Sequence, residues 1–332
     1  MSMPHPMCEA WRGPVLENLH LGHAVICDAG GDIVHAWGDP NAVMLPRSSS
    51  KMIQALPLIT SGAAGVFGLR QDQLALACAS HNGATIHTNR VQAWLSDLGL
   101  GDHDLRCGPQ MPRDPEEQAS LRAQDMTPCQ WHNNCSGKHL GFLTLNKHLR
   151  GGAEYHEPEH AVQKACLNAF EEATGQDALG YGIDGCSAPN FATTVHGLAR
   201  AMAWFASATD RNDLACNAAS DLVQAMCAYP ELVAGEGRAC TEMIRAMNGR
   251  VAVKTGADAV FVAIIPARKM GVALKIADGT MRAAECAIAH ILIGLGVLEA
   301  NHPVAQKYRT PSIANWNGII CGGVKPAAGF SV

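Results

Sequence analysis

The sequence predicts an α+β fold in which strands from both ends of the chain form one antiparallel sheet and helices fill the middle. Two apolar segments, residues 24–27 and 33–37, flank Gly30-Gly31, a pair that tolerates the backbone of a tight hairpin turn. Between the two ends of the chain, apolar residues recur three and four positions apart, which indicates helices. Residues typical of strands concentrate again at 251–254, 259–265, 271–276 and 319–321.

These segments divide the chain into two regions. We expect a sheet region at about residues 20–60 and 250–332 and an inserted helical region at about 61–249, within one domain spanning 1–332. Residues 101–130 are polar and contain prolines, which predicts a long loop or insertion that could line a cleft. Apolar spacing and flanking glycines predict helices at residues 48–59, 91–98, 158–174, 195–207, 212–228 and 281–298.

The composition is that of a soluble globular protein. The chain has 332 residues, of which 48% are hydrophobic and 17% charged. Its formal net charge of −5 provides no basic face for phosphates, so nucleic acid is not an expected partner. Thirteen scattered cysteines, an odd number in a chain of this size, favour a reducing cytoplasmic setting over a disulfide framework.

No segment is typical of an export signal or a membrane span. The first nine residues lack a basic start followed by an apolar run. The most apolar stretch, residues 283–298, is shorter than a bilayer requires and has Arg282, Glu285 and His290 beside or within it. We therefore expect a buried helix there and no membrane partner.

Ser48 and Lys51 form a Ser-x-x-Lys pair. Three positions apart on a helix, the two side chains lie on the same face, about one turn apart. A lysine held neutral at that distance can accept the serine hydroxyl proton and make the serine a nucleophile. The apolar residues that follow would bury the lysine and favour its neutral form. Because serine and lysine are common, the pair alone is weak evidence for a catalytic site.

Two further short sequences strengthen this interpretation. Residues 80–82 have the form Ser-x-Asn, and residues 254–256 read Lys-Thr-Gly. Together with Ser-x-x-Lys, and in this order along the chain, they are the motifs of penicillin-recognising serine enzymes. The expected elements place Ser80 in the helical region and Lys254 on a strand of the sheet.

Cys135 lies in a segment, residues 132–139, that is rich in polar and metal-capable groups. It could be a small buried residue, as most cysteines of this kind are. Alternatively, its expected place near a helix N-terminus favours a thiolate, which could act as a nucleophile with His132 or His139 as base.

A metal site is a third interpretation of the same segment. Cys186 lies in a second cysteine-containing segment, residues 182–189. Cys135, Lys138 and Cys186 could bind one ion, and thiolates favour zinc. Lysine is an unusual ligand because it must first lose its proton.

Taken together, these segments resemble the rhizobial-type, or class 3, L-asparaginases. The resemblance covers most of the chain, from the first hairpin to the last strand. It is carried by Pro46-Arg47-Ser48-Ser49-Ser50-Lys51, Cys78-Ala79-Ser80-His81-Asn82-Gly83, Asn134-Cys135-Ser136-Gly137-Lys138-His139, Gly185-Cys186-Ser187 and Lys254-Thr255-Gly256-Ala257.

The resemblance implies a serine-β-lactamase-like fold, a homodimer, and hydrolysis of L-asparagine to L-aspartate and ammonia by a single catalytic domain. It implies that two Ser-Lys tandems meet in the site, Ser48 with Lys51 and Ser80 with Lys254. It also implies a zinc ion beside the site, held by Cys135, Lys138 and Cys186.

General chemistry then predicts the roles of individual residues. Ser48 would attack the side-chain amide carbon with Lys51 as base, and the resulting acyl-enzyme would be hydrolysed by water. Three residues are candidates for binding the substrate, because arginine suits a carboxylate and aspartate suits an ammonium: Arg47, Asn82 and Asp184. Arg47 could equally be a structural ion-pair partner.

Two functions of other kinds remain open. One is a penicillin-recognising peptidase, β-lactamase or esterase, although such enzymes usually work outside the cytoplasm and no export signal is evident. The other is a non-enzymatic small-molecule sensor that retains the pocket. Such a sensor would be expected to have lost Ser48 or Lys51, and both are present.

Overall fold

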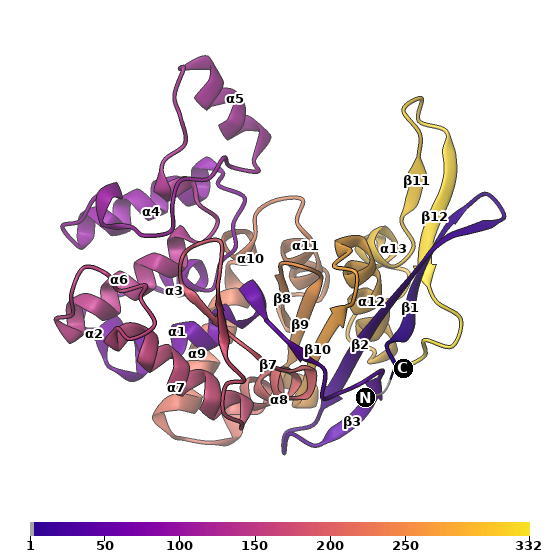
Figure 1. The fold of residues 1–332 in the computed structure, drawn as a ribbon, viewed down its shortest axis with the longest axis horizontal. Helices are drawn as coiled ribbons and strands as arrows, with labels where there is room; N and C mark the ends of the chain where they lie inside the picture. Colours follow the sequence, from indigo (N-terminus) through magenta and orange to yellow (C-terminus); the bar gives the residue numbers. More distant parts are fainter. Residues whose placement is uncertain (1–2) are drawn as a thin grey trace. The chain divides into compact units, whose positions relative to one another are not determined.

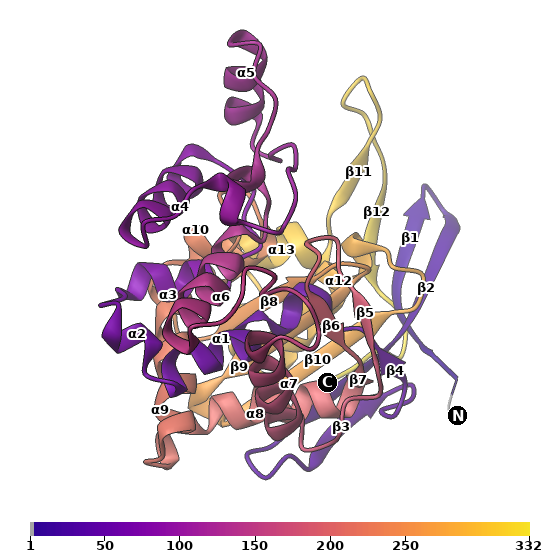
Figure 2. The same ribbon diagram turned by 60° about the vertical axis from the view of Figure 1, so that its left-hand side comes forward.

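The computed structural model describes residues 3–332, which form two compact units. We call them the sheet unit and the helical unit (Figures 1 and 2). The described part of the sheet unit comprises residues 3–49, Thr193–Ser207 and Glu242–Val332, and the helical unit comprises Ser50–Ala192 and Ala208–Thr241. The expectation of a single catalytic domain stays a prediction.

The sheet unit is built on one antiparallel sheet. Its strands follow the order β11-β12-β1-β2-β10-β9-β8, and β3 pairs with β2. The strands are β1 (His5–Arg12), β2 (Val15–Cys27), β3 (Ile33–Trp37), β8 (Ala252–Gly256), β9 (Val260–Ile265), β10 (Met270–Ile276), β11 (Ser312–Ala314) and β12 (Ile320–Pro326). Strands from both ends of the chain therefore share one sheet, which confirms the predicted α+β class.

The first hairpin forms where the sequence predicts it. β2 and β3 pair with Ala24 opposite Trp37, and Gly31 adopts the left-handed backbone of the turn, with φ of 85°. β1 was not expected, because bulges between Pro6 and Cys8 and between Ala10 and Trp11 break the alternation that marks a strand. It pairs with β12, so the indigo and yellow strands lie side by side in Figure 1.

Helices α8 (Val195–Ala206) and α12 (Met281–Gly294) pack on this sheet. α8 contacts β2, β9 and β10, and it approaches β10 so closely that a Cβ on Gly271 would overlap the backbone of Ala203. α8 belongs to the sheet unit, although the sequence predicts residues 195–207 as part of the helical region. Helical spacing alone does not reveal which layer an amphipathic helix covers.

The helical unit is arranged around α1 (Lys51–Thr60), which contacts α3 (Gln71–Ala77), α6 (Ser136–Leu149), α7 (Ala161–Thr174) and α9 (Leu214–Ala228). Most residues of α1 are buried. The unit also contains α2 (Ala63–Val66), α4 (Thr85–Asp97), α5 (Pro115–Ala123) and α10 (Pro230–Val233). A hairpin of β5 (Tyr181–Ile183) and β6 (Pro189–Phe191) completes it.

The segment 101–130, expected as one long loop, contains α5. Asp114 caps this helix by accepting a hydrogen bond from the backbone N–H of Glu117, and Pro115 occupies its first position. These start signals are present in the sequence, but the helix is short and mostly polar. No helix among residues 3–332 is long and apolar enough to cross a membrane.

Candidate active site

Ser48 lies in a tight turn of the sheet unit, in a 3-10 helix (Arg47–Ser50) that ends where α1 begins at Lys51. The backbone N–H and the hydroxyl of Ser49 both donate to the carbonyl of Pro46, over 3.2 and 2.7 Å. Ser48 itself is half-buried. It therefore precedes the α-helix, whereas the sequence predicts it within the helix.

Lys254 is brought close to this turn within the sheet unit. It lies in β8 as predicted and is fully buried, and its Nζ donates to the carbonyl of Thr255 over 3.1 Å. At the end of β8, a Cβ on Gly256 would overlap the carbonyl oxygen of Pro46. The strand that carries Lys254 and the turn that carries Ser48 therefore pack directly against each other.

Lys51 is buried in the helical unit, with 1% of its surface exposed. Its Nζ donates to the carbonyl of Ala79, the residue before Ser80, and to the sulfur of Cys135 over 3.1 Å. Lys51 thus contacts the segment of the second serine. No local pattern in the sequence indicates the contact of Lys51 with Cys135.

Ser80 begins a turn that several segments of the helical unit hold in place. Its backbone N–H donates to the carbonyl of Val233 over 2.9 Å, and the N–H of His81 donates to the carbonyl of Asn134 over 3.1 Å. The His81 ring lies 2.9 Å from the hydroxyl of Ser136. Burial lowers the pKa of His81 well below its usual value, which favours a neutral ring.

Asn82 and Asp184, two of the three expected substrate-binding residues, both lie in the helical unit and bond to their own surroundings. The Asn82 amide nitrogen donates to Asp114 over 3.4 Å, and its oxygen accepts from the N–H of Ala84 over 3.3 Å. Asp184 starts the turn between β5 and β6 and accepts from the N–H of Gly185 over 2.8 Å. Their binding roles stay predictions.

Arg47, the third, lies in the sheet unit and forms an ion pair with Asp258. An ion-pair role was one of the two roles expected for Arg47, but its partner was not identified from the sequence. Asp258 follows the Lys-Thr-Gly sequence by two residues, but nothing in the sequence alone shows that it faces Arg47.

The three residues expected to bind a metal come together in the helical unit. Cys135 caps α6, Lys138 lies in its first turn, and Cys186 lies in the β5–β6 turn. Lys138 Nζ lies 3.0 Å from the sulfur of Cys186, and the Cys135 thiol donates to the side-chain oxygen of Asn134 over 3.0 Å. All three side chains are buried.

The charges within this cluster depend on one another. The interaction with the Cys135 side chain lowers the pKa of Cys186 well below its usual value despite burial, and the charge of Lys138 acts in the same direction. The same interaction, together with burial, raises the pKa of Cys135. Burial alone would lower the pKa of Lys138, but the Cys186 thiolate outweighs it, so that this pKa is raised.

The rings of the two histidines that could serve as a base for Cys135 bond to other groups. His139 Nδ1 lies 2.8 Å from the hydroxyl of Tyr155. His132 lies 3.2 Å from the sulfur of Cys129 and 3.4 Å from the carboxylate of Glu117. Within residues 3–332, neither imidazole hydrogen-bonds to the Cys135 thiol, and the basic group in contact with that sulfur is the amino group of Lys51, at 3.1 Å.

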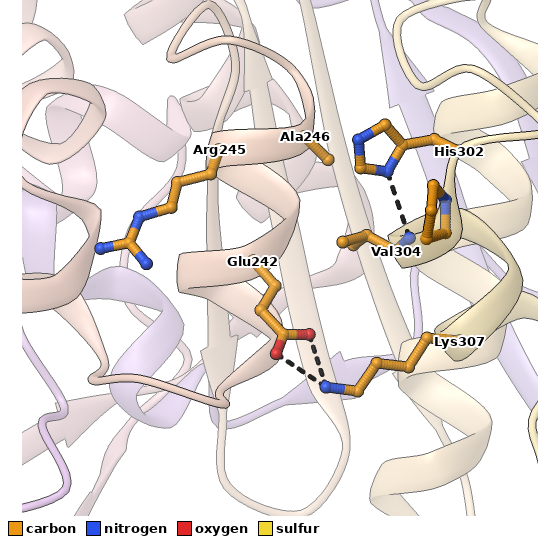
Figure 3. Close-up of a pocket in the computed structure, with 7 residues that line it drawn as sticks. Glu242, Arg245, Ala246, His302, Val304 and Lys307 are labelled. Atoms are coloured by element: carbon orange, nitrogen blue, oxygen red, sulfur yellow. Dashed lines mark hydrogen bonds and ion pairs between the residues drawn. The ribbon is translucent and has the colours of Figure 1, made fainter.

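A cavity of about 380 Å³ lies elsewhere in the sheet unit, between α11 (Ala239–Ala246) and α13 (Pro303–Arg309) (Figure 3). The amino group of Lys307 lies 2.7 Å from both carboxylate oxygens of Glu242, and the hydroxyl of Tyr308 donates to one of them. None of the residues proposed from the sequence lines this cavity, so it is separate from the candidate site.

Comparison with solved structures finds matches over most of this chain at low sequence identity. Mglu in its tris and glutamate form is 13% identical with a TM-score of 0.47, covering 91% of this chain and 65% of Mglu. This chain therefore spans less than two thirds of the length of Mglu. A β-lactamase from Mycobacterium bovis is 14% identical with a TM-score of 0.41, covering 79% of this chain and 89% of that one.

A class C β-lactamase is 15% identical with a TM-score of 0.40, covering 79% of this chain and 90% of that one. At these scores the likeness carries no inference about activity. Comparison with curated proteins gives no match.

The sequence matches a family model over residues 8–326, a range that contains every residue of the candidate site, and the family is described as L-asparaginase II. The match extends over nearly the whole chain. The chain therefore belongs to the L-asparaginase II family of amidohydrolases.

Proposed function

We propose that this chain hydrolyses L-asparagine to L-aspartate and ammonia through an acyl-enzyme formed on Ser48. The observation that carries this proposal is the family match over residues 8–326, which includes both Ser-Lys tandems. The packing within each unit supports it further. The sheet unit brings the Ser48 turn against the strand of Lys254, and the helical unit brings Lys51 against the segment of Ser80.

In the proposed mechanism, Ser48 Oγ attacks the side-chain amide carbon of asparagine. Lys51, in its neutral form, accepts the hydroxyl proton, which then passes to the amide nitrogen so that ammonia leaves. Water hydrolyses the remaining ester, releasing aspartate and restoring the serine hydroxyl. Backbone N–H groups near Ser48 would stabilise the oxyanion, but the N–H of Ser49 already donates to Pro46 and is not available.

Ser80 and Lys254 would relay protons or orient the Ser48 hydroxyl. Arg47 would bind the substrate carboxylate and Asp184 its ammonium group, with Asn82 as a further hydrogen-bonding residue. The charge of Asp184 also contributes to raising the pKa of Lys138, which indicates that Asp184 lies close to the cysteine–lysine cluster.

The donor set in the helical unit fits one zinc ion. Lys138 contacts the sulfur of Cys186, Cys135 is buried at the start of the same helix as Lys138, and the lowered pKa of Cys186 favours the thiolate that a metal requires. No group of three or more histidine, cysteine or acidic side chains among residues 3–332 offers an alternative. Zinc would supply a Lewis acid beside the site, while the two serines and two lysines provide the nucleophile and the bases.

We further propose a cytoplasmic homodimer. The homodimer rests on the resemblance to the class 3 L-asparaginases. The cytoplasmic setting is supported by the thirteen cysteines, which are all free thiols in the structure. Light scattering during size-exclusion chromatography measures the mass in solution, and a monomeric mass would reject the dimer.

One assay tests the proposed reaction. Purified protein is incubated with L-asparagine and, separately, with a chromogenic cephalosporin, and ammonia release and colour change are followed. We expect ammonia from asparagine and no cephalosporin hydrolysis. Cephalosporin hydrolysis without ammonia release would identify a penicillin-recognising hydrolase, and activity on neither would favour a sensor. L-glutamine belongs in the same assay, because one extra methylene is worth only about 1–3 kcal/mol in a pocket.

A further inference from the structure

Two turns of the sheet unit meet beside Ser48. One is the turn at residues 46–49, and the other joins β8 to β9 at residues 256–259. Gly256 allows them to approach, because a Cβ there would overlap the carbonyl oxygen of Pro46 and lie 3.2 Å from the backbone nitrogen of Ser49. The hairpin that carries Lys254 therefore packs against the backbone on both sides of Ser48.

Arg47 has an uncommon backbone conformation in this turn. Its φ of 55° is left-handed, a region that residues other than glycine rarely adopt. Such conformations persist where surrounding contacts hold them, and they cluster at functional sites. Because Arg47 directly precedes Ser48, whatever fixes Arg47 also fixes the approach of the chain to the proposed nucleophile.

Asp258, in the facing turn, holds the side chain of Arg47. Its carboxylate accepts a hydrogen bond from Arg47 Nη1 in an ion pair. The Asp258 backbone is itself left-handed, with φ of 55°, and Ala259 follows with φ of 59°. The amino group of Lys275 on β10 donates to the carbonyl of Asp258. Asp258 is thus fixed from the sheet side while its side chain reaches Arg47.

The exposure of the Arg47–Asp258 ion pair to solvent indicates that the pair orients the Arg47 side chain and adds little to the stability of the fold. The side chain of Asp258 is 65% exposed and that of Arg47 is 26% exposed. Ion pairs this accessible to water contribute little to folding, because solvent screens them. Their geometry can nevertheless restrict a long side chain to one direction.

We propose that Asp258 is a positioning residue that holds the Arg47 guanidinium in the orientation needed to bind the substrate carboxylate beside Ser48. This inference rests on the proposed function, in which Arg47 contacts the substrate and Asp258 acts only through Arg47. Arg47 would then have both of its expected roles, because the structural ion pair with Asp258 orients the guanidinium that binds the substrate.

The test compares Asp258→Asn, Asp258→Glu, Arg47→Gln and the double variant Asp258→Asn/Arg47→Gln in L-asparagine hydrolysis. Asp258→Asn should raise KM about tenfold and change kcat much less, because Arg47 loses its orientation but not its charge. Asp258→Glu should recover most of the loss. The double variant should match Arg47→Gln alone, because Asp258 has no effect without Arg47.

Glu17→Gln is the matched control. Glu17 forms an exposed ion pair with Arg12 in the same sheet unit, with 2.7 Å between charged atoms. It should leave KM, kcat and the unfolding temperature unchanged. A merely structural Asp258 would lower the unfolding temperature of Asp258→Asn without the selective rise in KM.

The outcomes separate this inference from the proposed function. If the unmodified protein hydrolyses asparagine and Asp258→Asn has the same KM, only the positioning role is rejected. Independent losses in Asp258→Asn and Arg47→Gln that multiply in the double variant would reject it as well. An unmodified protein that releases no ammonia from asparagine would reject the proposed function, and the positioning role with it.

Discussion

The amino group of Lys51 lies 3.1 Å from the sulfur of Cys135 inside the helical unit. The lysine proposed as base for Ser48 thus contacts one of the three proposed zinc ligands. It also contacts the carbonyl of Ala79, directly before Ser80. A change at the cysteine–lysine cluster should therefore alter the surroundings of the base, even if the metal contributes nothing to the chemistry itself.

We expect Ser48→Ala and Lys51→Ala each to lower kcat by about a thousandfold or more, and the double variant to be little worse than either. A nucleophile and its base act as one unit, so removing the second member costs little once the first is lost. Lys254→Met should lower kcat by nearly as much. Steady-state ammonia release measures each variant.

Retention of activity would change the assignment of the serines. If Ser48→Ala turns over asparagine at nearly the normal rate, Ser80 becomes the nucleophile and Lys254 its base. A full loss in Ser48→Ala with an active Lys51→Ala would leave Ser48 as nucleophile and require a base other than Lys51.

We expect one zinc per chain in protein purified without chelator, and little or none in Cys135→Ala. Elemental analysis measures the content, and Cys227→Ala is a suitable control because Cys227 lies in α9, outside the cluster. Metal-free protein, or full zinc in Cys135→Ala, would contradict the site. Removing zinc with chelator should weaken substrate binding more than it lowers kcat.

Zinc occupancy should fall steeply as the pH drops below neutrality. The ligands must be deprotonated when they bind the ion, so binding releases protons and the affinity rises with pH. In the metal-free protein the pKa values of Lys138 and Cys135 are raised, which makes this competition stronger. Equilibrium dialysis between about pH 5 and 8 measures the effect, and a pH-independent occupancy would argue against a lysine ligand.

Stability should decrease as the pH is lowered through the range in which histidine titrates. Burial lowers the pKa of His87 below 6.5, and the ring stacks 4.8 Å from the ring of His81, whose pKa is lowered further. Above about pH 6.5 both rings are neutral in the folded and unfolded chains, and their full contribution to stability is present.

Below that pH the unfolded chain binds protons first, so stability is lost until the folded-state pKa values are reached. His87→Gln keeps a donor for the carbonyl of Glu231, which lies 2.8 Å from His87 Nε2, and removes one titrating group. Thermal unfolding measured from pH 8 to 5 should therefore show a shallower decline for His87→Gln. If the unfolding temperature falls equally steeply with pH in both proteins, the His87 ring is not buried in solution as it is in the structure.

Gly271→Ala should destabilise the protein by about 3 kcal/mol. A Cβ at this position would meet the backbone of α8 at Ala199 and Ala203, which cannot move aside as a side chain can. Gly152→Ala is the control, because a Cβ there has no neighbouring atom within 4 Å, and it should change stability by less than about 0.5 kcal/mol. Denaturant unfolding measures the stability of both variants. If Gly271→Ala is as stable as Gly152→Ala, α8 lies further from the sheet than the structure places it.

Local patterns in the sequence predict much of the fold. Some elements are determined by residues close together in the chain, so the spacing of apolar residues and the turn residues identify them. These elements are the turn at Gly30-Gly31, the strands that follow residue 250 and the helix after Lys51. β1 was missed because its bulges interrupt the alternation, and α5 because it is short and polar. The layer that α8 covers could not be predicted, because it depends on a contact with Gly271 about seventy positions away.

The same distinction applies to the candidate site. Cys135 and Lys138 were expected together because three positions on one helix share a face, and α6 places them so. The contacts of Lys51 with Cys135 and of Arg47 with Asp258 join residues that are far apart in the chain, and no local pattern reports them. Predicting them would have required the tertiary structure.

The pairing of β1 with β12 has a consequence for synthesis on the ribosome. The helical unit ends at Thr241, so all of its residues are made before β8 to β12 emerge. The first strand of the chain, by contrast, has no β12 to pair with until residues 320–326 have been translated. Long-range strand pairing of this kind is slow, and exposed strand edges promote aggregation. During translation, β1 can pair with β2, but its other edge stays unpaired until nearly the whole chain has been made, and we expect that edge to be prone to aggregation.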